Sequence, residues 1–380
     1  MALSLAGRVL RGGRIVEGVV AIVEGRIGPG PEGEARTLPA GWLVCPGFVD
    51  LQVNGFGGAE VGDDPLALAA VAEALPSSGV TAFCPTLVSR APDAYRRAAT
   101  AMKRVGVPIH AARPLGVHLE GPFLAPTRPG AHDRGALRDP SPEAVDRLLD
   151  AFAPTIITLA PELPGGLEAT RRIARSRCVV AVGHTEADAA VGRAAIAAGA
   201  RLVTHALNAM RGIESREPSA LVAFLADPRA HVSLIADGIH VDPAVAAVLA
   251  RAAGRRLVLV SDAVAAAGAP AGRYPLGGRR VVSDGERVLW EGRLAGSALG
   301  LDRGPATLVA AGLAPSAALY AATEAPRALL GLPRGLTRGE AADIVVLDPG
   351  LVPRLTLVGG RVAFADPGLP FAVPGVGGSI

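Results

Sequence analysis

Four short apolar segments, far apart in this chain of 380 residues, each end in a residue that can bind a metal ion or move a proton. The four residues are Glu120, His184, His205 and Asp262. Continuous apolar runs of this kind are typical of strands that are buried on both faces of a parallel sheet. In a (β/α)8 barrel, the carboxyl ends of such strands meet at one face, and the functional residues lie there. The pattern therefore predicts an α/β fold, a (β/α)8 barrel of the TIM type with one functional site.

Strand-like and helix-like segments alternate between residues 46 and 334, as such a barrel requires. The low aromatic content, 3%, indicates a core of Ala, Val, Leu and Ile, which suits the barrel interior. The expected strands are Phe48–Val53, Val80–Pro85, Leu115–Glu120, Ile156–Ala160, Val179–Gly183, Leu202–His205, Val232–Ala236 and Leu257–Ser261. The expected helices are Leu66–Leu75, Ala91–Val105, Pro142–Ala153, Glu186–Ala198, Pro243–Ala253, Leu301–Gly312 and Pro315–Leu330.

The two ends of the chain have a different sequence pattern from the barrel region. Residues 1–45 and 335–380 contain short β-type segments separated by Gly and Pro, a pattern typical of an all-β module. Because both ends share this pattern, we expect one small β-sandwich domain built from both termini. The metal-dependent catalytic barrel is expected to span residues 46–334.

The composition excludes several classes of partner. The formal net charge is only +3 and no basic run occurs, so nucleic acid is not an expected partner. No uncharged apolar run reaches the ~18 residues of a membrane helix, so a membrane is not expected either. The three isolated cysteines, Cys45, Cys84 and Cys178, indicate a reducing compartment. The N-terminus lacks the apolar core of a signal peptide, and we expect a cytoplasmic protein.

The residues at the strand ends predict a metal site with a base beside it. Glu120, His184 and His205 form a three-ligand set that suits Zn²⁺ and leaves a position for water. Fe²⁺, Mn²⁺ and Co²⁺ are the alternatives for the same ligands. Asp262 ends the most apolar strand and is expected to act as the general base. His118 lies on the same face of its strand as Glu120, where it either supports a ligand or packs in the core.

Further polar residues follow the expected strands in loops. They are His132, Asn208, Arg216 and His240. An arginine fork together with an amide and imidazoles suits an anionic, hydroxyl-rich ligand such as a sugar phosphate.

Many segments, in order along the chain, resemble motifs of the N-acetylglucosamine-6-phosphate deacetylase family of the amidohydrolase superfamily. The resemblance begins near residue 46 and continues through the barrel to residues 338–348 (RGEAADIVVLD). The barrel segments are 46–58 (PGFVDLQVNGFGG), 116–123 (GVHLEGPF), 130–132 (GAH), 183–185 (GHT), 204–210 (THALNAM), 236–241 (ADGIHV), 260–263 (VSDA) and 295–299 (AGSAL).

This resemblance implies removal of the acetyl group from N-acetylglucosamine 6-phosphate, which gives glucosamine 6-phosphate and acetate. It implies metal ligation by Glu120, His184 and His205 and proton transfer by Asp262. In the mechanism that we expect, His132 helps to stabilise the oxyanion. A phosphate site in this family can borrow residues from a neighbouring subunit, which implies a homodimer or a higher homo-oligomer. The implied substrate-binding residues are His132, Asn208, Ala209, Arg216 and His240.

One departure from the superfamily pattern concerns the number of metal ions. Many amidohydrolases carry His-x-His at the end of the first strand, whereas this chain has Gln52 and Asn54. Amides are poorer ligands than imidazoles for a borderline cation, so we expect one divalent metal ion per chain.

Two alternative functions remain open at this point. Another mononuclear amidohydrolase, such as a nucleobase deaminase or a cyclic-amide hydrolase, has no need of a phosphate clamp, so Arg216 and the pair Asn208-Ala209 argue against it. A non-catalytic amidohydrolase-like scaffold would not need all of the metal-site residues together with Asp262.

Overall fold

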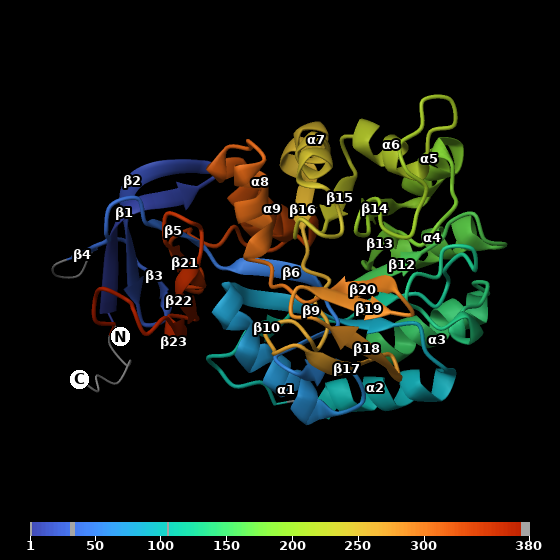
Figure 1. Ribbon diagram of the computed structural model, residues 1–380, viewed down its shortest axis with the longest axis horizontal. Coiled ribbons are helices and arrows are strands. Elements are labelled where there is room, and N and C mark those ends of the chain that lie inside the picture. The colour runs from blue at the N-terminus through green and yellow to red at the C-terminus, as the bar shows by residue number, and fades with distance from the viewer. Residues whose placement is uncertain (1, 31–34, 105, 374–380) are drawn as a thin grey trace.

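A computed structural model describes residues 2–30, 35–104 and 106–373 of the chain. Its main body is a parallel barrel surrounded by helices, with a separate sheet beside it (Figure 1). The barrel strands pair in chain order, from the first strand through to the last. They are β6 Phe48–Val53, β9 Val80–Val88, β11 His118–Glu120, β12 Ile156–Leu159, β13 Val179–Val182, β14 Ala200–Val203, β15 His231–Leu234 and β16 Leu257–Leu259, with the short β10 Arg113–Pro114 beside β9. The predicted barrel is confirmed.

The barrel closes where its first strand meets its last. There, Val53 and Ala263 form an isolated parallel bridge. The Ala263 carbonyl also accepts the backbone N–H of Asn54 at 2.7 Å and that of Gly55 at 3.1 Å. The closing contact lies at the carboxyl end of β6 and just past that of β16, at the face where the predicted site residues gather.

The helices pack around the barrel through small aliphatic side chains. They are α1 Pro65–Ala74, α2 Pro92–Arg104, α3 Pro142–Phe152, α4 Gly166–Arg175, α5 Ala189–Ala198, α6 Ala220–Ala226, α7 Pro243–Ala253, α8 Arg303–Ala310 and α9 Pro315–Leu329. Side chains of Ser141, Asp188 and Asp242 accept backbone N–H groups at the starts of α3, α5 and α7, which satisfies donors that have no partner within the helix. Within the described ranges, no helix is both long enough and apolar enough to cross a lipid bilayer.

Two helices, α4 and α6, were absent from the sequence-based expectation. Helix α4 is strongly amphipathic, with Ala169 and Ile173 buried on one face and arginines on the other, so its helical period was present in the sequence and was overlooked. Helix α6 has seven residues that are all apolar, and such a run cannot be distinguished from a buried strand by its period.

The terminal segments form one hydrogen-bonded sheet beside the barrel (Figure 1). Its strand order is β23-β22-β21-β5-β1-β2-β3, and β4 pairs with β1. Its apolar core is contributed by both ends of the chain, with Leu5 and Val20 from one end and Ile344 and Leu357 from the other. Residues 1, 31–34 and 374–380 of these segments lie outside the described part. The strands are β1 Ala2–Arg11, β2 Arg14–Val23, β3 Arg26–Ile27, β4 Arg36–Thr37, β5 Leu43–Pro46, β21 Ile344–Leu347, β22 Pro353–Val358 and β23 Arg361–Ala365.

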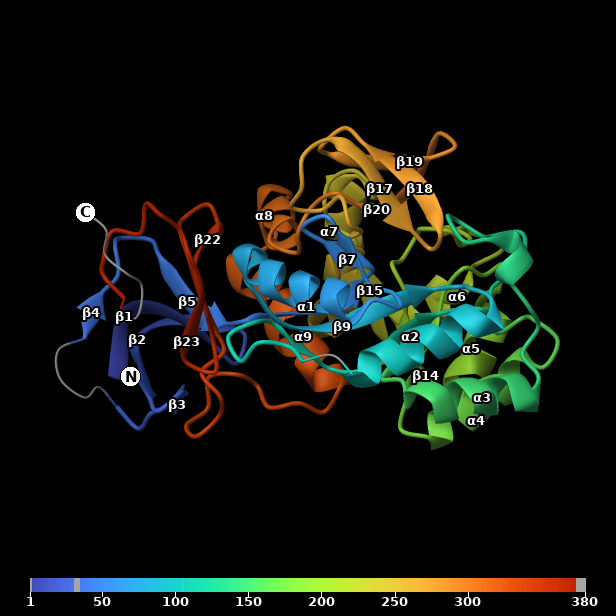
Figure 2. The ribbon, with the colours of Figure 1, turned by 90° about the horizontal axis from the view of Figure 1, so that it is seen from below.

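A further antiparallel sheet is inserted between the last barrel strand and α8, and it lies over one face of the barrel (Figure 2). Its strands are β17 Gly272–Leu276, β18 Arg279–Ser283, β19 Arg287–Trp290 and β20 Arg293–Ser297. The sequence interpretation did not include this sheet. Arg279 holds it against the barrel loops, because its guanidinium pairs with Asp133 at 2.9 Å and donates to the Ala131 carbonyl at 3.1 Å. A short hairpin of β7 Gly55–Phe56 and β8 Ala59–Glu60 follows the first barrel strand.

Candidate active site

The four strand-end residues meet at the carboxyl face of the barrel. Glu120 is the last residue of β11, while His184, His205 and Asp262 lie two or three residues past the ends of β13, β14 and β16. The last three have positive φ angles of 49°, 29° and 51°. A non-glycine residue in this region costs of order 1–3 kcal/mol, and such residues concentrate at functional sites because the surrounding structure holds them there.

Glu120, His184 and His205 form a compact group of metal-ligand atoms. All three are buried, and their ligand atoms lie within 4.8 Å of one another. The Glu120 Oε1 atom is 3.1 Å from His184 Nε2 and 2.8 Å from His205 Nε2, and the two Nε2 atoms are 3.2 Å apart. Around a tetrahedral zinc ion with bonds of ~2.0–2.1 Å, ligand atoms are about 3.3 Å apart. The triangle of donors therefore fits a divalent cation with only a small expansion.

Neighbouring groups set the protonation of these ligands. His184 Nδ1 lies 2.9 Å from the Arg128 carbonyl, which can only accept, so Nδ1 carries the proton and Nε2 keeps its lone pair for a cation. Burial lowers the pKa of His184 to about 4, which keeps the ring neutral. Burial alone would raise the pKa of Glu120, but a hydrogen bond from His132 and the close contacts with the rings of His184 and His205 hold it well below its usual range. The carboxylate and the imidazole are thus in the forms that bind a metal ion.

His132 presents a hydrogen-bond donor to the same site. Its Nδ1 accepts the backbone N–H of Ser89 at 3.1 Å, and this N–H can only donate. A neutral ring then carries its proton on Nε2, the atom that lies 3.4 Å from Glu120 Oε2. The backbone of Ser89 therefore selects the tautomer of His132.

Asp262 is buried beside the metal-ligand group. Burial and then the charge of Glu120 raise its pKa, His205, His240 and a hydrogen bond from Asn54 act in the opposite direction, and the result is a rise from 3.8 to about 7. The Asn54 Nδ2 atom donates to Asp262 Oδ1 at 2.8 Å. A carboxyl group with a pKa near neutrality is suited to accept and return a proton at physiological pH.

A cavity of about 220 Å³ opens onto these groups. Inserted-sheet residues Leu276, Leu294 and Ala295 form part of its wall. Arg216 does not line the cavity: it lies on the exposed loop 212–217 between β14 and α6. Gln52 lies beneath the site, where its Nε2 donates to Glu120 Oε1 at 3.0 Å. The sequence-predicted residues that do line the cavity are Asn54, Glu120, His132, His184, His205, Asn208, Ala209, His240 and Asp262.

Asp237 is a site residue that the sequence interpretation missed. Its Oδ2 atom lies 2.8 Å from His240 Nδ1 and accepts the Ser297 hydroxyl at 2.9 Å. Because the carboxylate holds the proton on Nδ1, His240 Nε2 is left for the cavity. The spacing Asp237-Gly-Ile-His240 was a signal that could have identified this pair.

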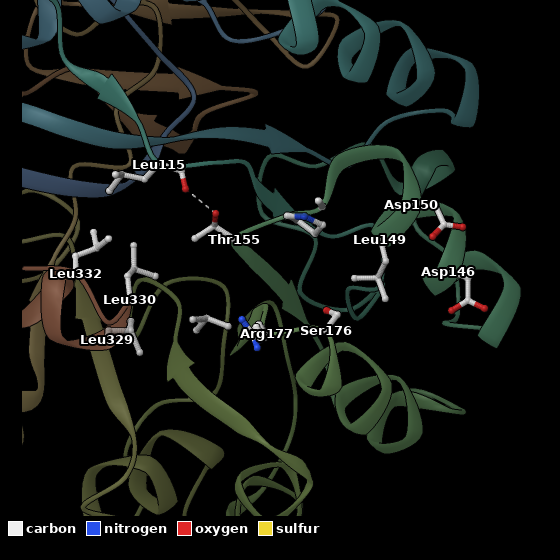
Figure 3. Close-up of a pocket in the computed structure, with 13 residues that line it drawn as sticks. Leu115, Asp146, Leu149, Asp150, Thr155, Ser176, Arg177, Leu329, Leu330 and Leu332 are labelled. Atoms are coloured by element: carbon white, nitrogen blue, oxygen red, sulfur yellow. Dashed lines mark hydrogen bonds between the residues drawn. The ribbon is translucent and has the colours of Figure 1, made fainter.

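A larger cavity, of about 670 Å³, lies at the opposite end of the barrel, around the amino ends of β12 and β13 (Figure 3). Leu115, Leu149 and Leu330 contribute much of its lining, and the Thr155 hydroxyl is bonded to the Leu115 carbonyl at 2.7 Å. No histidine lines it, so size alone does not identify the catalytic centre here.

Gly130 leaves room for the His184 ring, and we expect Gly130→Ala to weaken metal binding. A Cβ atom at this position would lie 2.9 Å from His184 Cε1, and the backbone φ of 54° also disfavours alanine. Displacing a ligand's support typically costs ~10–100-fold in metal affinity. Competition with a chelator measures the change. Gly135→Ala, in the same loop but with only ordinary contacts near its Cβ, is the control and should bind metal like the wild type.

Comparisons with known proteins agree with this geometry. Residues 43–364 match the model of the amidohydrolase family. The human N-acetylglucosamine-6-phosphate deacetylase is 35% identical, with 94% of each chain covered. An N-acetylgalactosamine-6-phosphate deacetylase from Escherichia coli O157:H7 is 36% identical, with 92% of this chain and 94% of the relative covered.

Solved structures show the same relationship. A variant of the deacetylase from Mycobacterium smegmatis, in complex with N-acetyl-D-glucosamine-6-phosphate, superposes with a TM-score of 0.89 at 34% identity, covering 96% of this chain and all of the other. The enzyme from Thermotoga maritima has a TM-score of 0.85 at 26% identity, covering 96% of this chain and all of the other. The chain therefore belongs to the amidohydrolase family and, within it, to the N-acetylglucosamine-6-phosphate deacetylase family.

Proposed function

We propose that this enzyme hydrolyses N-acetyl-D-glucosamine 6-phosphate to D-glucosamine 6-phosphate and acetate in amino-sugar metabolism. The observation that carries the proposal is the buried group Glu120, His184 and His205 with Asp262, a carboxyl group not needed as a ligand, beside it in the same cavity. The family relationship supplies the substrate class, since the relatives are named as deacetylases of amino-sugar 6-phosphates.

We infer that one divalent ion, Zn²⁺ in preference to Fe²⁺, Mn²⁺ or Co²⁺, is held by Glu120, His184 and His205. When bound, such an ion supplies Lewis-acid activation of water and of the amide carbonyl. A second ion is not favoured, because the amides of Gln52 and Asn54 already donate to Glu120 and Asp262. Both amide nitrogens thus face carboxylates, and the amide oxygens that remain are poorer ligands for a borderline cation than imidazole nitrogens.

In the proposed mechanism, the protein's own residues move the protons. Asp262 accepts a proton from the attacking water and later delivers it to the departing amine. His132 directs its Nε2–H into the cavity, where it can donate to the amide oxygen as negative charge develops there. Asn54 and the buried surroundings keep the Asp262 carboxylate aimed at the reacting atoms.

For the 6-phosphate, we propose His240 and Asn208 from the cavity wall together with Arg216. Asp237 orients His240, and Asn208 and Ala209 lie on the loop after β14. The exposed position of Arg216 favours an action across a subunit interface, which agrees with the homodimer or higher homo-oligomer that we propose.

We expect Arg216→Ala to lower kcat/KM for the phosphorylated sugar ~10–100-fold, because a hydrogen bond to a charged group is worth roughly 1.5–3 kcal/mol. Any residual activity on unphosphorylated N-acetylglucosamine should hardly change. Kinetics on both sugars measure the difference. Arg229→Ala, which removes an exposed guanidinium paired with Asp227 elsewhere, is the control. Equal losses on the two sugars would show that Arg216 has a structural role only.

The experiment that tests the proposed function is a substrate panel on zinc-reconstituted enzyme. Release of acetate is followed for N-acetylglucosamine 6-phosphate, N-acetylgalactosamine 6-phosphate and unphosphorylated N-acetylglucosamine. We expect the highest kcat/KM on the first. The 36% identical relative named for the galactosamine epimer makes the second sugar the alternative substrate, and a higher kcat/KM on it would replace our assignment. Absence of acetate release from all three would refute the deacetylase assignment.

A further inference from the structure

Asp50 carries a carboxylate that crosses the closing seam of the barrel. The residue lies in β6, is 0% exposed, and takes all its hydrogen bonds from neutral donors. Its Oδ1 atom accepts the backbone N–H groups of Gln52 and Ser261, each at 3.2 Å, and its Oδ2 atom accepts the Ser261 hydroxyl. Ser261 follows β16, so this one side chain joins the first strand to the segment after the last.

The segment that Asp50 holds contains Asp262. The Ser261 hydroxyl accepts the N–H of Ala263 at 3.0 Å, so the residues on both sides of Asp262 are tied to the same cluster. On the other side, the Asp262 carbonyl accepts the N–H of Ser297 at 2.9 Å. Between these anchors Asp262 has φ 51°, a conformation that non-glycine residues rarely adopt. The anchors are what maintain it.

Closure of the barrel alone does not explain why an acid is buried at position 50. Burial raises the pKa of Asp50, the hydrogen bonds from Ser261 and Gln52 lower it, and the result is a pKa of about 6. Ionised carboxylates are costly to bury. The other neighbouring barrel strands are joined by backbone ladders, and no acid is needed there. Asp50 binds Ser261, which is the residue directly before the base Asp262. A role in placing Asp262 would explain why a buried acid is kept at this position.

We propose that Asp50 is a positioning residue for deacetylation: through Ser261 it holds the backbone of Asp262 so that the base faces the substrate cavity. The inference rests on the proposed function, because it takes Asp262 as the general base. Asp50 does not line the cavity and touches no reacting atom. It should therefore affect kcat rather than substrate binding, and only while Asp262 can act as a base.

Three variants test this role at saturating Zn²⁺. Asp50→Ala removes every acceptor and should lower kcat ~10–100-fold with little change in KM, since small misplacements of a catalytic group have effects of this size. Asp50→Asn keeps an oxygen for the two N–H groups and should restore most of the loss. Ser261→Ala removes only the bridging hydroxyl and should give an intermediate kcat. It also supplies the test if Asp50→Ala does not fold.

The matched control is Asp343→Ala. Asp343 is also buried, but it pairs with Arg113 and accepts the N–H of Gly359, away from the cavity. We expect this variant to have a lower Tm and a wild-type kcat.

The decisive comparison repeats Asp50→Ala and Ser261→Ala in an Asp262→Asn background. Once the base is absent, neither change should lower kcat further, whereas a general structural defect would lower it by the same factor in both backgrounds. Crystal structures of the metal-free Asp50→Ala and Ser261→Ala variants give a readout that needs no activity, and Asp262 should leave its left-handed conformation in them. An equal fall in both backgrounds, or a wild-type kcat with Asp262 unmoved, would overturn the proposal. If the wild-type enzyme released no acetate, the proposed function would fail, and the crystal structures would still decide what Asp50 holds.

Discussion

Asp262→Asn should lower kcat by ~10²–10⁴ or more while leaving metal content and KM close to those of the wild type. Removal of a general base costs about this much, and the same carboxyl group is also expected to protonate the departing amine. Asparagine keeps the shape of the side chain, and its oxygen can still accept from Asn54. Steady-state kinetics with metal analysis on the same sample measure the effect. A variant that kept more than about a tenth of the wild-type kcat would show that another group moves the proton.

The pH dependence of the wild type checks the same assignment. Since burial and Glu120 raise the pKa of Asp262 to about 7, kcat/KM should fall as pH drops through this region and the base becomes protonated. A bound cation favours the carboxylate, so the acid limb should lie at or below about pH 7. This limb should disappear in Asp262→Asn.

Stability should move in the opposite direction to activity. The metal-free wild type binds the Asp262 proton more tightly when folded, with a pKa of about 7 against 3.8, so its free energy of unfolding falls as pH rises through that interval. The neutral asparagine avoids this loss. At pH 8 the metal-free variant should therefore have the higher Tm. Asp343→Asn, which changes a buried acid outside the cavity, should show no such gain.

Loss of the metal site should have an effect as large as loss of the base. His184→Ala leaves Glu120 and His205, and two protein donors rarely retain a divalent ion. Because a bound ion lowers the pKa of water from 15.7 to about 7, its loss should reduce turnover to background. Chelation of the wild type should do the same. Added Zn²⁺ should restore the activity of the wild type, with about one ion bound per chain, but it should not restore the activity of the variant.

A second readout separates this effect from misfolding. Zn²⁺ should raise the Tm of the wild type, because an ion that binds only the folded state stabilises it, and it should not raise the Tm of His184→Ala. His231→Ala changes a histidine at the start of β15 that does not line the cavity, and this control should respond to zinc like the wild type. Two tightly held ions per wild-type chain would contradict the single-metal proposal.

The sequence was sufficient to predict the residues that have side chains able to bind a metal ion or move a proton and that follow directly from the order of the barrel strands. Glu120, His184, His205 and Asp262 each end an apolar run, and parallel strands in a barrel must bring such ends together. The cavity they share with His132, Asn208 and His240 could be anticipated from the motifs, but not its wall.

What could not be predicted has physical reasons. The backbone N–H of Ser89 selects the tautomer of His132, and since almost every residue has such a group, no sequence pattern marks it. The first-strand segment that contains Asp50 was recognised, but its partner Ser261 is distant in sequence and the link exists only when the barrel closes. The strands β17–β20 are rich in Arg and Gly and partly exposed, so they lack the apolar runs that revealed the barrel strands.

The inserted sheet has a consequence for how this enzyme family can diversify. Leu276, Leu294 and Ala295 belong to one continuous stretch of chain that the barrel does not need for closure, yet they face the substrate cavity. Exchange of residues 272–295 between relatives would replace a wall of the cavity while Glu120 and Asp262 kept their supports. Recognition of a sugar epimer can in this way evolve separately from the chemistry of amide hydrolysis, because one exchangeable segment forms the wall and the barrel holds the catalytic residues.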